Sequence, residues 1–222
     1  MKIIIILKYI KIILLFLSII LSSYTLFFKK RKIENYKINN INDKIIYIDN
    51  FLNKNEIDKI LNNIKNIKNL KNEKFRLIKP LDNDINKEIY DIFYSYNNLN
   101  KLKKKLKNNK ILKSDFPIEY RIYPNKSDGM KLHSDILLYD LPQYEAIYTI
   151  NNTSDSKTKW IDSNNKINEI WTKPNSLLII KANGYKHLVT PINKGERSIF
   201  KLIYTQSNNT NNNYDRELLR FI

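Results

Sequence analysis

The chain has 222 residues, 42% of them hydrophobic and 12% aromatic, which excludes a disordered protein and fits one folded domain with additional segments. It has no cysteine, so disulfide bonds and thiolate metal sites are excluded. The formal net charge of +17 would attract anionic partners such as nucleic acid or lipid. The lysines are scattered, however, and Lys, Asn and Ile are all abundant. This pattern favours the codon bias of an AT-rich genome over a basic binding stripe.

The N-terminal segment has the pattern of a membrane anchor. Residues 12–28 form an uncharged run of 17 residues, residues 3–10 can lengthen it, and a basic cluster at residues 29–32 ends it. A membrane-spanning helix needs about 20 apolar residues, whereas the apolar core of a cleaved signal peptide has only ~7–15. We therefore expect a retained single-pass anchor within residues 1–28, with a cleaved signal as the alternative. Basic residues flank both ends, so the orientation stays open.

A polar linker over residues 29–43 leads to the main domain, expected over residues 44–205. The domain opens with a short strand at residues 44–49. Asn53 and Glu56 have the spacing of an N-terminal capping box, and isoleucines at helical spacing follow them. An amphipathic helix is therefore predicted after Asn53.

A short strand at residues 75–78, a second amphipathic helix over residues 85–96 and a basic helix end or loop at residues 101–107 complete the first half. From residue 116 the pattern changes to about eight short β-type runs separated by turn residues, which predicts a β-sandwich or jelly roll. An Asn-rich tail is expected over residues 206–222: a loose segment, then a short apolar stub able to pack on the domain. The expected strands are residues 118–123, 132–138, 144–150, 160–161, 169–171, 176–181, 186–189 and 198–204.

The chemistry is carried by the two histidines of the chain. His133 stands two residues before Asp135, and His187 is followed ten residues later by Arg197 in a β-type run. Side chains two apart on a strand point to the same side, so His133 and Asp135 can share a ligand. Two imidazoles and one carboxylate can bind Fe(II) on one face and leave its other coordination positions open. A guanidinium can bind a carboxylate through two parallel hydrogen bonds. The alternative is that these are ordinary core and turn residues, because such short motifs arise by chance.

The sequence resembles the prolyl 4-hydroxylase-like branch of the Fe(II)/2-oxoglutarate dioxygenases, in particular the divergent members of large DNA viruses and algae. The resemblance covers residues 44–205, from IIYIDNFLNKNEIDKIL through YPNKSDGMKLHSD, AIYTIN and NSLLII to HLVTPINKGERSIFKLIYT. It implies a mainly β fold with a double-stranded β-helix (jelly-roll) core and supporting N-terminal helices, here preceded by one transmembrane helix.

The resemblance also implies roles for individual residues. His133, Asp135 and His187 would bind iron, and Arg197 would pair with the distal carboxylate of 2-oxoglutarate. Further contacts to the co-substrate are expected from two residues, Tyr123 and Thr149.

Three features of the sequence leave questions open about the expected pocket. Thr149 would face inward unless the register slips by one residue, in which case Tyr148 would do so. Alternation from Arg197 places Lys201 on the same side, which is unusual and suggests contact with the barrel mouth or an acidic substrate. A Gly-Gly-x-Thr-x-Phe-like segment of the family is reduced here to Thr158-x-Trp160.

By this resemblance the protein would be an Fe(2+)- and 2-oxoglutarate-dependent dioxygenase that hydroxylates a peptidyl side chain, with proline favoured, and releases succinate and CO2. L-ascorbate is an optional reductant. It would be anchored in a membrane, either a host endomembrane or a virion membrane, and act on a peptide or protein; the oligomeric state is open. The alternatives are a non-catalytic membrane or virion-surface module and a nucleic-acid dealkylating oxygenase. Nucleic acid is disfavoured because Ile203 replaces the second Arg that such relatives usually carry.

Overall fold

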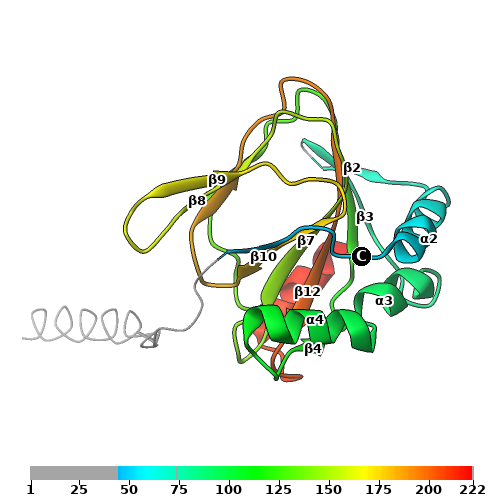
Figure 1. Cartoon of the computed structure of the whole chain (residues 1–222), viewed down its shortest axis with the longest axis vertical. Coiled ribbons are helices and arrows are strands. Elements are labelled where there is room, and N and C mark those ends of the chain that lie inside the picture. The colour runs from blue at the N-terminus through cyan, green and yellow to red at the C-terminus, as the bar shows by residue number, and fades with distance from the viewer. Residues whose placement is uncertain (1–44, 74, 222) are drawn as a thin grey trace, which may run out of the picture. The chain divides into compact units, whose positions relative to one another are not determined.

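The computed structural model describes residues 45–73 and 75–221. The expected membrane anchor and nearly all of the linker lie outside the described residues. Within the part that is described, no helix is both long enough and apolar enough to span a bilayer. The described residues form a mainly β structure with two antiparallel sheets and a few helices (Figure 1).

The larger sheet has the strand order β1-β10-β7-β12-β5-β3-β2, with β4 paired to β12, and the smaller sheet has the order β6-β11-β8-β9. This pair of antiparallel sheets is consistent with a jelly roll. The strands of the larger sheet are β1 (Ile46–Ile48), β2 (Lys71–Glu73), β3 (Arg76–Pro80), β4 (Leu112–Lys113), β5 (Glu119–Tyr123), β7 (Tyr144–Asn152), β10 (Ser176–Lys181) and β12 (Arg197–Thr205). Those of the smaller sheet are β6 (Met130–His133), β8 (Thr158–Ile161), β9 (Ile167–Ile170) and β11 (His187–Val189).

The first helix begins where the sequence predicts. Asn53 Oδ1 accepts a hydrogen bond from the backbone N–H of Glu56 (3.0 Å), and Glu56 Oε2 accepts one from the N–H of Asn53 (2.9 Å). This capping box satisfies two N–H groups that no helical carbonyl can reach. The expected second helix over residues 85–96 ends at residue 93, and Ser95 caps a new helix through the N–H of Asn98 (3.2 Å) that includes most of the basic run at residues 101–107. The helices are α2 (Lys54–Ile64), α3 (Lys87–Phe93), α4 (Tyr96–Leu106), α5 (Asn212–Leu218) and the 3-10 helix η1 (Leu219–Phe221).

The hydrophobic core lies between α2–α4 and one face of the larger sheet (Figure 1). Phe93 of α3 contacts the rings of Tyr148 on β7 and Phe200 on β12, with centroid distances of 5.1 and 5.7 Å. Alternate residues of β7 and β12 therefore face the helices, and the residues between them face the smaller sheet. Tyr148 belongs to the helix side, so the alternative register that would turn it into the pocket is wrong.

The C-terminal segment differs from the expected loose tail. Residues 212–218 form α5, and Tyr214 packs on Phe116 and Tyr139 at centroid distances of 5.4 and 5.5 Å. The stub does pack back as expected, because Phe221 of η1 contacts Phe116 at 5.6 Å. A small aromatic cluster thus holds the C-terminal helices against the β-structure.

Gly129 allows β6 to approach β11 closely. Its φ of +74° is unfavourable for other residues, and a Cβ atom there would lie 2.3 Å from the carbonyl oxygen of Val189. The pairing that follows places His133 of β6 directly opposite His187 of β11. The two histidines therefore meet because a glycine precedes β6.

We expect Gly129→Ala to lower the free energy of unfolding by roughly 1–3 kcal/mol, because the added methyl group clashes with backbone and is strained at positive φ. Chemical denaturation of the full-length chain measures this change. Asp128→Ala, at an exposed neighbouring position, is the control and should leave stability within about 0.5 kcal/mol of the unmodified chain. Equal stabilities of the two variants would contradict this explanation of Gly129.

Candidate metal centre

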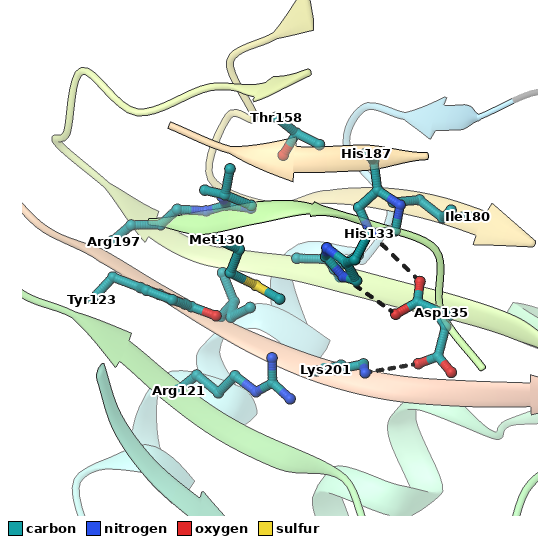
Figure 2. A pocket seen from close by; sticks show the side chains of 14 residues that line it. Arg121, Tyr123, Met130, His133, Asp135, Thr158, Ile180, His187, Arg197 and Lys201 are labelled. Atoms are coloured by element: carbon teal, nitrogen blue, oxygen red, sulfur yellow. Dashed lines mark ion pairs between the residues drawn. The ribbon is translucent and has the colours of Figure 1, made fainter. Parts of the chain in front are cut away.

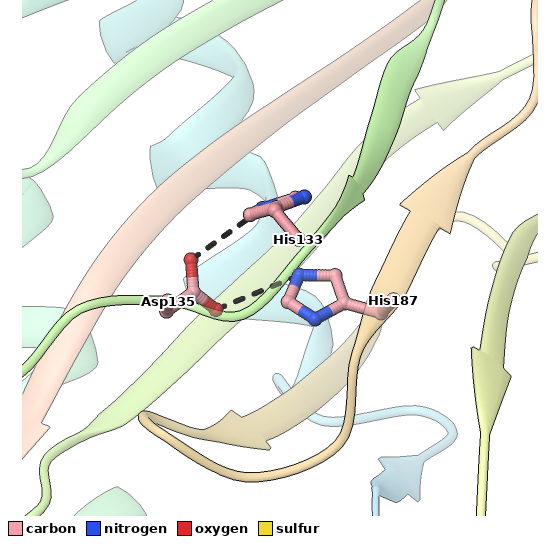
Figure 3. A group of neighbouring side chains, drawn as sticks. All are labelled: His133, Asp135 and His187. Carbon is pink, nitrogen blue, oxygen red and sulfur yellow. Dashed lines mark ion pairs between the residues drawn. The ribbon is translucent and has the colours of Figure 1, made fainter. Parts of the chain in front are cut away.

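Two neighbouring side chains of one segment and one from a distant segment converge between the sheets (Figure 3). His133 ends β6, His187 begins β11, and Asp135 lies in the loop after β6. Asp135 Oδ1 is 3.8 Å from His133 Nε2, and Asp135 Oδ2 is 3.5 Å from His187 Nε2. One potential ligand atom from each residue lies within 4.8 Å of the others. The sequence predicted this meeting, although Asp135 reaches it from a loop and not from the predicted strand over residues 132–138.

Both imidazoles are held with the same nitrogen facing the shared space. His133 Nδ1 lies 2.8 Å from the carbonyl oxygen of Lys131, and His187 Nδ1 lies 3.2 Å from that of Tyr185. A carbonyl can only accept, so each Nδ1 donates and each Nε2 keeps its lone pair for a metal. Burial lowers the pKa of His187, with Asp135 opposing, which favours the neutral form that binds metals.

The donor set matches a particular kind of metal. Two imidazole nitrogens and one carboxylate, all on one side, form the facial triad of non-haem Fe(II) enzymes and leave coordination positions open. The three residues that the sequence predicted as ligands therefore fit such an ion by chemistry and by proximity.

A cavity extends from this triad between the two sheets (Figure 2). Arg197 and Tyr123 lie at one end of the view, and Asp135 and Lys201 lie at the other. Arg197 on β12 is opposite Tyr123 on β5 in the strand pairing, so both predicted co-substrate residues line the same cavity.

Arg197 has the properties of an anion-binding residue without its anion. It is 3% exposed, and its Nε atom has no hydrogen-bond partner among the described residues. No carboxylate in the described part of the chain lies within ion-pair distance of Arg197, and burial lowers its pKa. A buried unpaired guanidinium is costly, and a carboxylate bound in a bidentate way would satisfy it. This orphaned donor fits the distal carboxylate of a dicarboxylic acid such as 2-oxoglutarate.

Thr149 does not reach the cavity. It is fully buried, and its hydroxyl donates to Thr172 Oγ1 at 2.9 Å instead. Alternation in the sequence predicted the correct face of β7 for Thr149, but it could not predict the hydrogen bond from its hydroxyl to Thr172. Thr158, at the start of β8, lines the cavity, so part of the reduced family segment does lie near the site.

Sequence reasoning missed two charged residues of the cavity, Glu145 and Arg121. Both could have been found by alternation, because Glu145 is four residues before Thr149 and Arg121 is two residues before Tyr123 on their strands. Lys201 faces the cavity as alternation from Arg197 predicts, and its Nζ lies 3.1 Å from Glu145 Oε2.

Arg121 forms a buried ion pair with Glu119. Its Nη2 and Nε atoms lie 2.8 and 3.1 Å from Glu119 Oε2, and both residues are buried. Burial alone would raise the pKa of Glu119, but the charge of Arg121, helped by that of Lys201, outweighs it and lowers this pKa below 4.5. The pair therefore stabilises the fold above the unfolded-state pKa, and this contribution is lost as pH falls through the folded-state pKa.

Comparisons with known proteins identify the fold. The sequence matches no protein-family model and no curated protein. The structure is similar to a 2OG-Fe(II) oxygenase family oxidoreductase from Burkholderia pseudomallei, with a TM-score of 0.66 and 8% identity over 75% of this chain and 86% of that one. The fold is that of the 2-oxoglutarate- and Fe(II)-dependent oxygenases.

Two other solved structures extend the comparison. A prolyl hydroxylase from Trichoplax adhaerens, in complex with a hypoxia inducible factor peptide fragment, has a TM-score of 0.56 and 16% identity over 74% of this chain and 84% of that one. HygX from Streptomyces hygroscopicus, with nickel and 2-oxoglutarate bound, has a TM-score of 0.54 and 10% identity over 72% and 82% of the two chains. The resemblance noted in the sequence is thus confirmed at the level of the fold.

Replacing Arg121 with Met should cost about 3–5 kcal/mol at pH 7, because it leaves the buried Glu119 carboxylate without its main partner. The stability difference from the unmodified chain should shrink as pH falls, because the buried Glu119 carboxyl, once deprived of Arg121, takes up a proton more readily than the paired one and so loses its uncompensated charge. Urea denaturation of both proteins at pH 7, 5 and 3.5 measures the trend. Lys159→Met, which removes an exposed ion pair with Glu169, is the matched control and should cost less than about 1 kcal/mol. A difference that stays constant with pH would contradict this account.

Proposed function

We propose that this protein is an Fe(II)- and 2-oxoglutarate-dependent oxygenase. The observation that carries the proposal is the combination, in one cavity, of two imidazoles with free Nε2 atoms, a carboxylate and a buried arginine without an anion. The oxygenase fold adds support, because related folds hold a metal and 2-oxoglutarate, as in HygX.

In the proposed mechanism His133, Asp135 and His187 hold the iron, and Arg197 and Tyr123 hold the far end of 2-oxoglutarate. Iron and co-substrate together supply the oxidation: O2 and 2-oxoglutarate are consumed, succinate and CO2 are released, and a substrate C–H group becomes C–OH. The chain contributes position. The three ligands would bind the ion on one side and leave the other side for the co-substrate and O2.

The proposed substrate is a peptidyl side chain, with proline favoured. Support comes from the similarity to prolyl hydroxylases, one of which is bound to a peptide fragment. The apolar run at residues 12–28 further leads us to propose a single-pass membrane localisation, at a host endomembrane or a virion membrane. L-ascorbate belongs in the assay as a reductant that keeps iron in the ferrous state.

The other functions that the sequence allowed receive less support. A non-catalytic module would have no use for three converging metal ligands and an unpaired arginine. For nucleic-acid dealkylation a second arginine would be expected at position 203, where Ile203 is 2% exposed and packs with Phe116, Leu138 and Tyr139.

The test of the proposal is succinate formation by the full-length chain, purified in detergent and supplied with Fe(II), ascorbate, 2-oxoglutarate and a proline-rich peptide. We expect iron-dependent turnover that the peptide stimulates, and its loss in His187→Ala. Asp128→Ala is the control and should stay active, because Asp128 is exposed and is not one of the three proposed ligands. Absence of both metal binding and turnover in the unmodified chain would refute the oxygenase assignment.

Arg197→Met should raise the Kd for 2-oxoglutarate at least 100-fold, because the bidentate partner of its distal carboxylate is lost. Metal affinity should change less than about threefold, since Arg197 contacts no metal ligand. Arg197→Lys should recover part of the affinity, because the charge returns without the planar fork. Calorimetric titration of 2-oxoglutarate into the Mn(II)-loaded proteins measures all three. Equal affinities for the unmodified chain and Arg197→Met would place the co-substrate elsewhere.

A further inference from the structure

The proposed function leaves one polar pair beside the metal centre without a role. Glu145 of β7 and Lys201 of β12 line the same cavity as the metal ligands, and Figure 2 shows Lys201 on the side of Asp135, away from Arg197 and Tyr123. Glu145 is 2% exposed, whereas the side chain of Lys201 is 23% exposed. A buried carboxylate and a partly accessible ammonium therefore stand where a substrate would meet the iron.

One carboxylate oxygen of Glu145 has no hydrogen-bond donor among the described residues. Its Oε1 accepts from Gln143 Nε2 at 3.1 Å. Its Oε2 lies 3.1 Å from Lys201 Nζ, close enough for an ion pair, yet this oxygen has no partner with hydrogen-bond geometry among the described residues. Only two buried side-chain atoms of the described chain are unsatisfied in this way, and the other is Arg197 Nε, which the co-substrate would satisfy. The remaining one calls for a donor from the substrate.

Lys201 offers the complementary group. An ammonium has three N–H donors, and one contact to Glu145 leaves others for an acceptor. Burial disfavours the charge of Lys201, but the Glu145 carboxylate 3.1 Å from its Nζ favours it. The pair as a whole thus presents one donor and one acceptor, side by side, with no net charge.

The hollow that opens outward from this pair is polar but balanced in charge. It measures about 240 Å³, and its outer wall includes Phe116 and Phe221. Its lining includes four cationic side chains and four carboxylates, so it shows no excess of either sign. Each of the cations also has a carboxylate partner. The pairs are Arg76–Glu73 (2.6 Å), Arg121–Glu119 (2.8 Å), Lys201–Glu145 (3.1 Å) and Arg220–Glu217.

We propose that Lys201 and Glu145 recognise an uncharged amide group of the substrate: Lys201 donates to the amide oxygen, and Glu145 Oε2 accepts from the amide N–H. The amide is either a peptide group next to the oxidised residue or a side-chain carboxamide. This inference rests on the proposed oxygenase function and adds the group by which the substrate is selected.

The same geometry disfavours charged ligands at this position. A carboxylate bound to Lys201 would bring a second negative charge beside the buried Glu145, with one ammonium to balance both. A cationic group bound to Glu145 would likewise bring a second positive charge beside Lys201. An uncompensated charge in a largely buried site is strongly unfavourable, whereas a neutral amide contacts both groups and adds no charge. We therefore expect the site to prefer neutral substrates, although the net positive charge of the chain would by itself favour anionic ones.

The test measures binding of blocked tripeptides, Ac-Ala-Xaa-Ala-NH2, to the full-length chain loaded with Mn(II) and 2-oxoglutarate. Paramagnetic relaxation of the peptide protons reports binding near the metal. Xaa is Leu, Asn, Asp or Lys, and a fifth peptide has an ester in place of the amide N–H of Leu. Asn and Asp differ in charge but hardly in shape, which makes them the decisive pair.

We expect the Leu and Asn peptides to bind at least threefold more tightly than the Asp and Lys peptides. A weaker ester would identify the peptide amide as the recognised group, and Asn binding well above Leu would identify a side-chain carboxamide. The proposal is overturned if the Asp or the Lys peptide binds most tightly. It is also overturned if neither comparison shows a difference in affinity, that is, if the ester peptide binds as tightly as the Leu peptide and the Asp peptide as tightly as the Asn peptide.

Two variants separate recognition from a merely structural role. Lys201→Met leaves an unpaired carboxylate and should move the preference toward the Lys peptide, and Glu145→Gln leaves an unpaired ammonium and should move it toward the Asp peptide. Each should weaken binding of the Leu peptide about tenfold, and Lys159→Met, at the exposed pair with Glu169, should shift neither preference. Unchanged charge preference in both variants would overturn the proposal.

Failure of the proposed function gives a different result. In that case Mn(II) does not bind the unmodified chain, which electron paramagnetic resonance of the free ion detects before any peptide is added. If Mn(II) and 2-oxoglutarate bind but the peptides show no amide preference, the oxygenase assignment stands and only the role of Lys201 and Glu145 is refuted.

Discussion

The alternation of side chains along β7 and β12 is the constraint on which the rest of the structure depends. These neighbouring strands at the middle of the larger sheet each send one set of residues to the helices and the other set toward the smaller sheet. Tyr148 and Phe200 anchor the packing on α3, whereas Glu145 and Lys201 face the cavity. A shift of one residue would exchange the two sets, placing charges in the apolar core and aromatic rings at the metal centre. The apolar packing thus fixes the register, and the register fixes the chemistry.

The sequence was sufficient to predict the parts that depend on local rules or on scarcity. The chain has only two histidines, so the pairing of His133 with His187 had no competitor, and the capping box at Asn53 needs only residues a few positions apart. The alternation that placed Arg197 and Lys201 on one side of β12 is equally local. Each of these predictions needed no knowledge of which strands pair.

Other features depend on contacts between distant residues and could not be predicted in this way. The hydroxyl of Thr149 donates a hydrogen bond to Thr172, which lies in the connection between β9 and β10. The C-terminal residues looked like a loose tail because they are rich in Asn, yet Asn211 caps α5, and Tyr214 and Phe221 find their partners only in the folded β-structure. Composition alone gives no sign of these partners.

The C-terminal helices have a further consequence for how such a protein can diversify. Glu217, Arg220 and Phe221 form part of the wall of the outer hollow, but none of them belongs to a strand that carries a metal ligand. Their attachment is an aromatic cluster around Phe116, separate from the large core under α2–α4. Substitutions in α5 and η1 can therefore reshape the hollow while His133, Asp135, His187 and the strands that support them remain as they are. This part of the wall and the candidate metal centre belong to separately replaceable parts of one domain, so the wall can change in evolution without the centre.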